Sequence, residues 1–226
     1  MRMAEQVHSV REDEANRQRS RYTPLQEYVW KKVEVLQAKY TADACGSAAP
    51  LARLRRAISS APGSDPLVWQ ETMEGLPVQF VGRDDEPSRE EHAVHAAITL
   101  FAMHQQSQST FRAHKRGQVF GHAASQLGRA IGEPPVLRRF QALATATSFE
   151  ETLTHARGLI SQFRSQKISL DYGRFAVDLA KLQDPRSADR VRLDWGRTYY
   201  FAPKTETVGT DAAQSSGDAE SNGEEQ

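Results

Sequence analysis

The sequence predicts an all-α protein, a bundle of about eight or nine helices with a division into two sub-bundles. Two observations support this prediction: apolar residues recur at helical spacing along most of the chain, and capping residues or prolines precede these runs. Strand patterns do not recur. We expect a flexible arm over 1–22, a helical sub-bundle over 23–132, a second over 133–203, and a disordered acidic tail over 204–226.

The first helices follow the arm. Residues 1–22 alternate Arg, Glu, Gln and Ser with few apolar groups, which is typical of a disordered or fraying segment. Thr23-Pro24 offers a cap and a proline at the first position of a helix, and Cys45-Gly46-Ser47 breaks that helix. A short helix over 50–59 follows, and then an element that starts at Asp65-Pro66 and stops near Gly75.

Two capping boxes predict further helix starts. Ser88 and Ser148 are each followed three residues later by a glutamate, Glu91 and Glu151, and then by apolar residues at helical spacing. The remaining expected elements are a polar loop over 105–117, a small-residue helix over 122–131, a helix begun by Pro134-Pro135 at the boundary between the sub-bundles, a helix containing Phe175, Leu179 and Leu182, and a last helix after Asp184-Pro185.

Charge is distributed unevenly, although the formal net charge is zero. From residue 205 onward the chain holds no Lys or Arg and six acidic residues, which are Glu206, Asp211, Asp218, Glu220, Glu224 and Glu225. Because the whole chain has 29 basic and 29 acidic residues, the remaining body carries a net charge of +6. A basic body indicates a polyanionic partner, and the acidic tail either masks the basic surface or keeps the protein soluble.

Helical spacing gives the basic residues a direction. Arg53 and Arg56 fall opposite the apolar face of the helix over 50–59, with Arg55 at its edge, while Arg138 points outward and Arg139 lies at the flank. Further basic residues lie on the last helix and in the loop beside Phe111: Arg186, Arg190, Arg197, Arg112, Lys115 and Arg116. Arginine forks suit phosphate oxygens, and an aromatic among cations suits an unpaired base. For a single arginine a solvated surface is the simpler interpretation, so the hypothesis of nucleic-acid binding depends on their grouping.

Several classes of function are disfavoured. The longest apolar stretch, residues 93–103, is too short to span a bilayer, and the acidic residues near the N-terminus do not fit a secretory signal. The single Cys45 agrees with a cytoplasmic protein. His92 and His95 lie three residues apart, but there is no HExxH motif and no third ligand, so we expect a pair on a helix surface. We find no active site and expect no metal and no cofactor.

Five short strings appear in order along the predicted helices: Leu100-Phe101-Ala102-Met103-His104-Gln105-Gln106-Ser107, Leu127-Gly128-Arg129-Ala130, Leu137-Arg138-Arg139-Phe140-Gln141-Ala142-Leu143, Asp171-Tyr172, and Trp195-Gly196-Arg197-Thr198-Tyr199-Tyr200. In order, spacing and helical setting, these strings resemble the CasB small-subunit family of the type I-E CRISPR Cascade complex. The resemblance covers roughly residues 25–201. The N-terminal arm and the acidic tail extend beyond the family core.

This resemblance implies a non-catalytic, all-helical subunit of a ribonucleoprotein in antiviral defence. It implies other Cascade subunits, crRNA, the target and displaced DNA strands, and a second copy of the chain as partners. Because the guide RNA reads the sequence by base pairing, protein contacts need only hold the backbone and the displaced strand. The family motif positions give Arg55, Arg56, Arg129, Arg138, Arg139 and Arg197 as phosphate contacts, and charge and exposure add Arg53, Lys115 and Arg116. His104, Trp195 and Tyr199 are expected in the core.

The leading hypothesis is therefore sequence-independent nucleic-acid binding that stabilises the R-loop of a surveillance complex. The alternative is a helical protein-interaction scaffold whose arginines meet acidic partner proteins without direct contact to nucleic acid. A metal-dependent hydrolase built on His92 and His95 is a distant third.

Overall fold

A computed structural model describes the backbone of residues 2–201 and the side chains of residues 20–201. Within this range the chain is all-α, as predicted, and the only β-type pairing is an isolated parallel bridge between His114 and Leu170. The α-helices are α1 (Arg2–Thr41), α2 (Ala48–Arg56), α3 (Trp69–Thr72), α4 (Arg89–His104), α5 (Phe120–Ile131), α6 (Glu133–Thr145), α7 (Phe149–Ser165), α8 (Tyr172–Leu182) and α9 (Pro185–Tyr200). Three short 3₁₀ turns cover Ala57–Ser59, Pro66–Val68 and Val78–Phe80. The predicted acidic tail, 204–226, lies outside the described residues.

The start of α1 differs from the prediction. The sequence places a helix start at Thr23-Pro24 after a flexible arm, whereas α1 begins at Arg2 and continues through Pro24. A proline inside a helix removes one backbone hydrogen bond, but the turn before it is anchored: the Tyr22 hydroxyl donates to Glu90 at 3.1 Å and its ring stacks on Phe80. The Glu, Arg and Gln residues upstream also have high helix propensity.

The predicted caps are largely confirmed. Ser88 and Glu91 form the complete capping box at the start of α4. At α7 only half of the box forms, because Ser148 accepts from the Glu151 N–H while the Glu151 carboxylate turns to the N–H of Thr147 at 2.7 Å. Asp184 caps α9, which has a proline in its first turn as expected.

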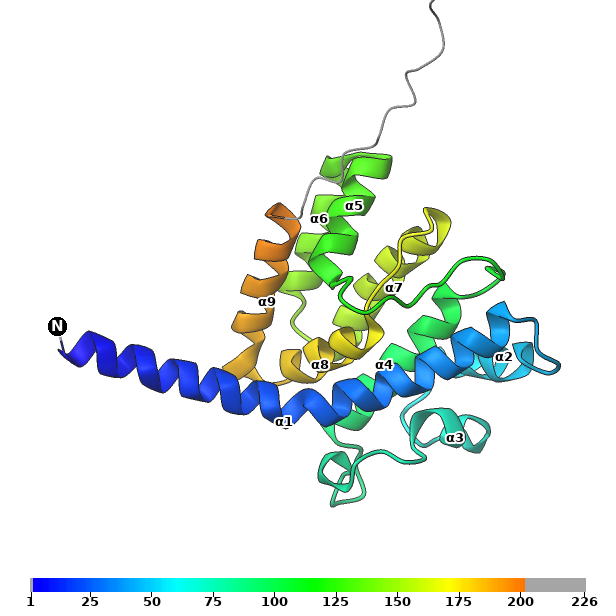
Figure 1. The fold of residues 1–226 in the computed structure, drawn as a ribbon, viewed down its shortest axis with the longest axis horizontal. Coiled ribbons are helices and arrows are strands. Elements are labelled where there is room, and N and C mark those ends of the chain that lie inside the picture. Colours follow the sequence, from blue (N-terminus) through cyan, green and yellow to red (C-terminus); the bar gives the residue numbers. More distant parts are fainter. Residues whose placement is uncertain (1, 202–226) are drawn as a thin grey trace, which may run out of the picture.

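Helix α4 forms the centre of the core. It packs against α1, α2, α7 and α8, and all of its residues from Ala93 to Ala102 are buried. Figure 1 shows α8 next to α1, and the two helices approach closely at Gly173 of α8. A Cβ at Gly173 would meet the Trp30 ring and, at 2.8 Å, the carbonyl of Gln26. This contact therefore requires glycine.

A stack of aromatic rings joins α5, α6, α8 and α9. Phe120 stacks on Trp195 and on Phe175, with ring centroids 5.0 Å apart in both pairs, and Phe140 stacks on Tyr199 at 5.1 Å. Trp195 and Tyr199 are buried, as expected for core residues. The boundary between sub-bundles at residue 132 stays a prediction, and this stack packs residues from both sides of it together.

Candidate nucleic-acid interface

Acidic residues are missing from four long segments of the chain. No Asp or Glu occurs in residues 44–64, 92–132, 134–149 or 152–170, whereas each of these segments contains Lys or Arg. The segments form α2, most of α4, the loop between α4 and α5, α5, and most of α6 and α7. The basic side chains on these elements therefore have few carboxylates near them in sequence, so their pairing depends on the fold.

The end of α2 and the end of α7 bring arginines together. Burial lowers the pKa of Arg55, and the positive charges of Arg56 and Arg164 lower it further. Arg164 donates to the side-chain oxygen of Gln106 at 2.9 Å, a neutral partner at the start of the α4–α5 loop. Two helices distant in sequence thus carry like charges close together.

The loop between α4 and α5 lies beside the connection from α7 to α8. The amide of Leu170 donates to the Ala113 carbonyl at 2.9 Å, and Lys115 donates its amide to the Leu170 carbonyl at 3.2 Å. The Ser169 hydroxyl also donates to the carbonyl of Arg112 at 2.8 Å. These backbone contacts hold Arg112 and Lys115 next to the segment that carries Lys167.

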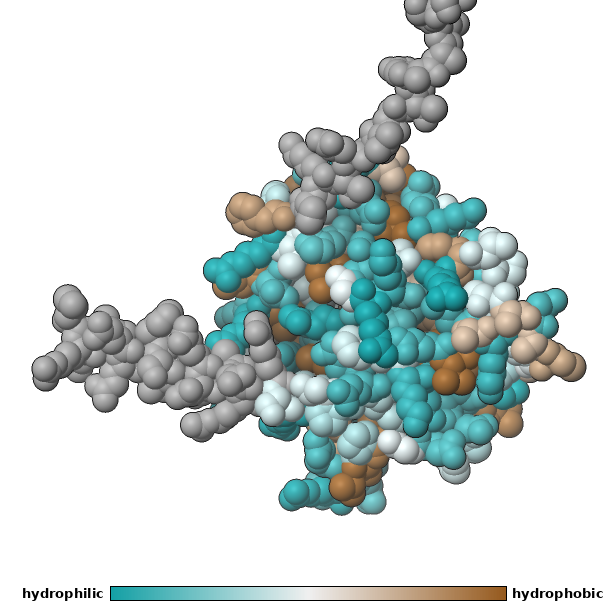
Figure 2. All heavy atoms as spheres, viewed as in Figure 1, coloured by the Kyte–Doolittle hydropathy of each residue, from teal (hydrophilic) through white to brown (hydrophobic). Residues whose placement is uncertain are grey.

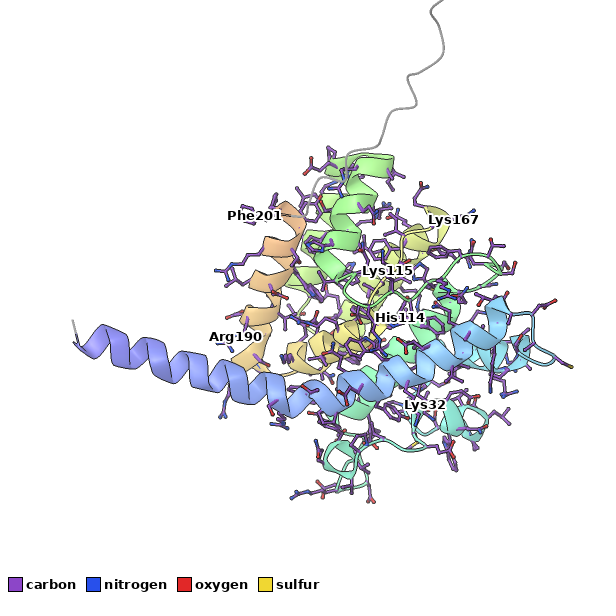
Figure 3. The ribbon with its side chains drawn as sticks, in the orientation of Figure 1. Lys32, His114, Lys115, Lys167, Arg190 and Phe201 are labelled. Carbon is purple, nitrogen blue, oxygen red and sulfur yellow. The ribbon has the colours of Figure 1, made fainter. Side chains whose placement is uncertain are left out.

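We call six side chains on these elements the basic surface: Arg55, Arg56, Arg112, Lys115, Arg164 and Lys167. None of the six forms an ion pair with any residue whose side chain the structure describes. Four of them are exposed, and Arg55 and Arg164 are partly buried. Figure 3 shows Lys115 and Lys167 on the two adjoining connections, and the face of the molecule drawn in Figure 2 is mainly hydrophilic, with apolar residues in separate patches.

Two predicted contact residues are already paired within the chain. Arg116 forms a two-point ion pair with Glu34, with its Nη2 2.8 Å from Oε2, and it lies over the Trp30 ring at 4.3 Å. The hydrogen bond from Arg116 lowers the pKa of Glu34, so both groups stay charged. Arg53 donates to the Leu67 carbonyl at 3.1 Å and lies 3.6 Å from Glu71. Arg53, predicted to lie opposite the apolar face of α2, is therefore partly exposed, with 30% of its side chain accessible, and is paired within the chain.

The other predicted residues lie on the upper helices in Figure 1. Arg129 is on α5 and donates to the Ser125 hydroxyl at 2.9 Å. Arg138 and Arg139 on α6 and Arg197 on α9 are exposed and have no ion pair among the described side chains. The nine predicted residues thus fall into three sets: Arg55, Arg56 and Lys115 in the basic surface, Arg53 and Arg116 in ion pairs, and these four on α5, α6 and α9.

The prediction that His92 and His95 form a pair on a helix surface is wrong. His95 is buried and its Nε2 lies 3.0 Å from the Ala57 carbonyl, while His92 is partly buried against Phe149. The helix face that carries them is covered by other elements, which spacing on a single helix cannot show. In the described part of the chain, no group of three or more His, Cys, Asp or Glu residues could hold a metal ion.

No described helix is long and apolar enough to cross a membrane.

The comparison with protein families decides the classification. The model of the family described as CRISPR-associated protein Cse2 matches residues 50–200. The chain belongs to this Cse2 family. The family suggested by the sequence strings is thereby confirmed.

Solved structures of the Cse2/CasB family share the fold. CasB from Thermobifida fusca is 29% identical with a TM-score of 0.67, and the match covers 79% of this chain and 98% of that chain. A Cse2-family protein from Thermus thermophilus is 21% identical with a TM-score of 0.57, covering 78% of this chain and 98% of that one. CasB from M. ruber is 22% identical with a TM-score of 0.55, covering 75% and 93%. A search of curated proteins gave no match.

Prediction from the sequence missed the residues that hold the loop between α4 and α5 in this Cse2-family chain. Gln37 and Asp171 are buried and bind the backbone of the loop, and Glu34 holds Arg116. One signal was available: Gln37 follows Val33 by four residues, so it lies on the apolar face of α1. A polar side chain on a buried face needs hydrogen-bond partners, and these are 77 residues away in sequence.

Proposed function

We propose that this Cse2-family chain is the non-catalytic small subunit of a CRISPR RNA-guided Cascade complex. In this role it binds nucleic acid without sequence specificity and stabilises the R-loop and the displaced strand in antiviral defence. Membership of the family implies a place in a Cascade complex. Its partners in this proposal are other Cascade subunits, crRNA, both target DNA strands and a second copy of the chain, in the cytoplasm.

The observation that carries the proposal is the basic surface. Its six cationic side chains come from α2, α7 and two adjoining connections and form no ion pair with any described side chain, so their charges are available to an external anion. Phosphate contacts fix position and carry no sequence information, which suits a subunit whose complex reads sequence through guide pairing. The proposal also keeps Arg129, Arg138, Arg139 and Arg197 as contacts on α5, α6 and α9, with Arg53 and Arg116 in a lesser role.

Charge reversal of the exposed basic surface tests this proposal. The variant Arg112→Glu, Lys115→Glu, Lys167→Glu replaces three exposed side chains, so we expect folding to be retained. Fluorescence anisotropy with single-stranded DNA between 50 and 200 mM salt, values at which counterion release is readily measured, should show binding at least ~10-fold weaker. The slope of log K against log salt should fall by about 2, because each lost phosphate contact removes about 0.7 for a single strand.

A matched control separates a local interface from bulk charge. The variant Lys31→Glu, Lys39→Glu, Arg83→Glu changes the net charge by the same amount at exposed positions outside the basic surface. We expect this control to weaken binding less and to keep the wild-type salt slope. Equal losses in both triple variants would contradict an interface at the basic surface.

The alternative scaffold function has one observation in its favour. Apolar side chains between residues 66 and 81 are exposed, including Leu67 at 63%, Trp69 at 47% and Val78 at 86%. Exposed apolar groups of this kind are typical of protein contacts. The same triple reversal distinguishes the two functions: lost assembly of the complex with unchanged DNA affinity supports the scaffold, and the opposite result supports nucleic-acid binding.

A further inference from the structure

The loop between α4 and α5, which carries Arg112 and Lys115, belongs to no helix or strand, and its backbone contacts with residues 169–170 reach only residues 112–115. Residues 105–119 have no regular secondary structure apart from the single bridge at His114. An unsupported loop would lose backbone and side-chain entropy on binding a ligand, and this loss lowers affinity. Whatever holds the loop in the free protein therefore affects how tightly its cations bind.

Three buried side chains hold this loop through its backbone. Gln105 is fully buried, donates to the carbonyls of Gln108 and Phe111 at 2.6 and 2.7 Å, and accepts from the Ala113 amide at 3.0 Å. The side chain of Gln105 therefore closes the first half of the loop on itself.

Gln37 of α1 holds the middle of the loop. Its Nε2 donates to the His114 carbonyl at 3.1 Å, and its Oε1 accepts from the His114 amide at 2.7 Å. These paired bonds resemble one rung of a sheet, and they place the residue before Lys115 against α1.

Asp171 joins the end of the loop to two helices. Its Oδ2 accepts from the Gly117 amide at 2.7 Å, and its Oδ1 accepts from Trp30 Nε1 of α1 at 2.6 Å and from the Arg174 amide at 3.0 Å, which caps α8. Asp171 is 2% exposed, so loss of its carboxylate would leave buried donors unpaired.

We propose that Gln37, Gln105 and Asp171 are positioning residues for nucleic-acid binding, which hold Arg112 and Lys115 in a preformed arrangement. This inference rests on the proposed function. For the loss of the Asp171 carboxylate, it predicts a change in nucleic-acid affinity of the opposite sign to the change that Coulomb attraction alone predicts. Removing a negative charge beside a basic surface should tighten binding to a polyanion by Coulomb attraction alone, whereas loss of loop order should weaken it.

Two substitutions with the same charge change separate these effects. Asp171→Asn keeps one acceptor oxygen and can still cap α8, while Asp171→Ala keeps none. We expect the Kd for single-stranded DNA to rise about threefold in Asp171→Asn and about tenfold in Asp171→Ala, because ordering a few loop groups costs a factor of this size. Hydrogen exchange of the amides of residues 113–117 should accelerate in the same order.

Asp184 provides the matched control. It caps α9 with its side chain as Asp171 caps α8, and its carboxylate binds the amide of Arg186 and the guanidinium of Arg89, not the loop. Asp184→Ala carries the same change of charge and the same loss of a cap. We expect its Kd to stay unchanged or fall, with loop exchange as in the wild type.

A neutral variant covers the case in which Asp171→Ala fails to fold. Gln37→Met keeps the size and charge of the side chain but loses both hydrogen bonds to His114. We expect the Kd for single-stranded DNA to rise and the salt slope to fall by about 0.7, the value for one lost phosphate contact. A purely structural role would lower thermal stability and leave this slope unchanged.

Tighter binding by Asp171→Asn or Asp171→Ala, or wild-type Kd and slope in Gln37→Met, would overturn the inference. Neither result would affect the proposed function, which the triple reversal of Arg112, Lys115 and Lys167 tests separately.

Discussion

At the scale of single residues, the buried histidines show the energetic cost of placing titratable groups in this core. His104 is fully buried, and its Nδ1 lies 2.9 Å from the Tyr172 hydroxyl. Burial lowers the pKa of His104 from its ordinary 6.5 to about 3. Burial also lowers the pKa of His95 and His114. These side chains are therefore neutral in the folded protein at physiological pH.

The pKa of His104 predicts loss of stability in mild acid. As the pH falls below 6.5, the unfolded chain binds a proton at this residue while the folded chain does not until about pH 3, so unfolding becomes more favourable. For one such proton, the free energy of unfolding falls by up to about 1.4 kcal/mol for each unit that the pH falls. We expect His104→Asn to reduce the pH dependence by about this amount between pH 6 and pH 5, a window inside the range given by these pKa values. Urea unfolding at both pH values checks it, and equal slopes in the two proteins would contradict it.

Side-chain direction on one helix was predictable, and pairing between helices was not. The exposure of Arg56, Arg138 and Arg139 follows from helical spacing. Arg53 lies on the same predicted face as Arg56, but the turn at Leu67 and the carboxylate of Glu71 cover it. These partners lie 14 and 18 residues further on, in an element whose position the sequence does not give.

At the scale of helices, glycine sets the distance between α5 and α9. A Cβ at Gly121 would collide with Thr198 Oγ1 and the Trp195 carbonyl, and it would lie 2.9 Å from the Tyr199 amide. Two of these atoms belong to the backbone of α9, so the helices would have to separate. The aromatic stack formed by Phe120 depends on this close approach.

Replacing this glycine should destabilise the fold. We expect Gly121→Ala to lower the free energy of unfolding by about 1–3 kcal/mol, the usual cost of overpacking. Gly196→Ala on α9 is the control, because a Cβ there meets nothing within 4 Å and alanine favours a helix by about 0.5–1 kcal/mol. Chemical denaturation measures both, and a Gly121→Ala protein as stable as the wild type would show that α5 and α9 can move apart freely.

Most helix boundaries were predictable because their signals are local. The cap at Ser88 and the prolines at the starts of α6 and α9 act within a few residues. The course of α1 through Pro24 was not predictable, since it depends on contacts of Tyr22 with Phe80 and Glu90. The contact of Asp171 with the loop between α4 and α5 was not predicted, because it also depends on residues distant in sequence: Trp30, one of its partners, is 141 residues away.

At the scale of the whole molecule, acidic and basic residues are concentrated in different segments of the sequence, and the fold determines which cations have acidic neighbours. The segments without Asp or Glu form α2, most of α4, the loop between α4 and α5, α5, and most of α6 and α7, and all six cations of the basic surface lie in three of these segments. Acidic residues lie mainly elsewhere, on α1, α3, α8 and α9 and in the connection before α4. The positive charge of the body predicted a polyanionic partner, but only the fold shows which cations form no ion pair with a described side chain.

The salt dependence of binding by the unmodified protein tests the central claim most directly. If the basic surface binds phosphates, the affinity for single-stranded DNA should fall linearly with salt on a logarithmic scale, and four to six contacts predict a slope of about −3 to −4. The measurement is a titration series by fluorescence anisotropy from 50 to 200 mM salt, a range over which such binding weakens strongly. DNA of different sequence should give the same slope. An affinity independent of salt would contradict the account.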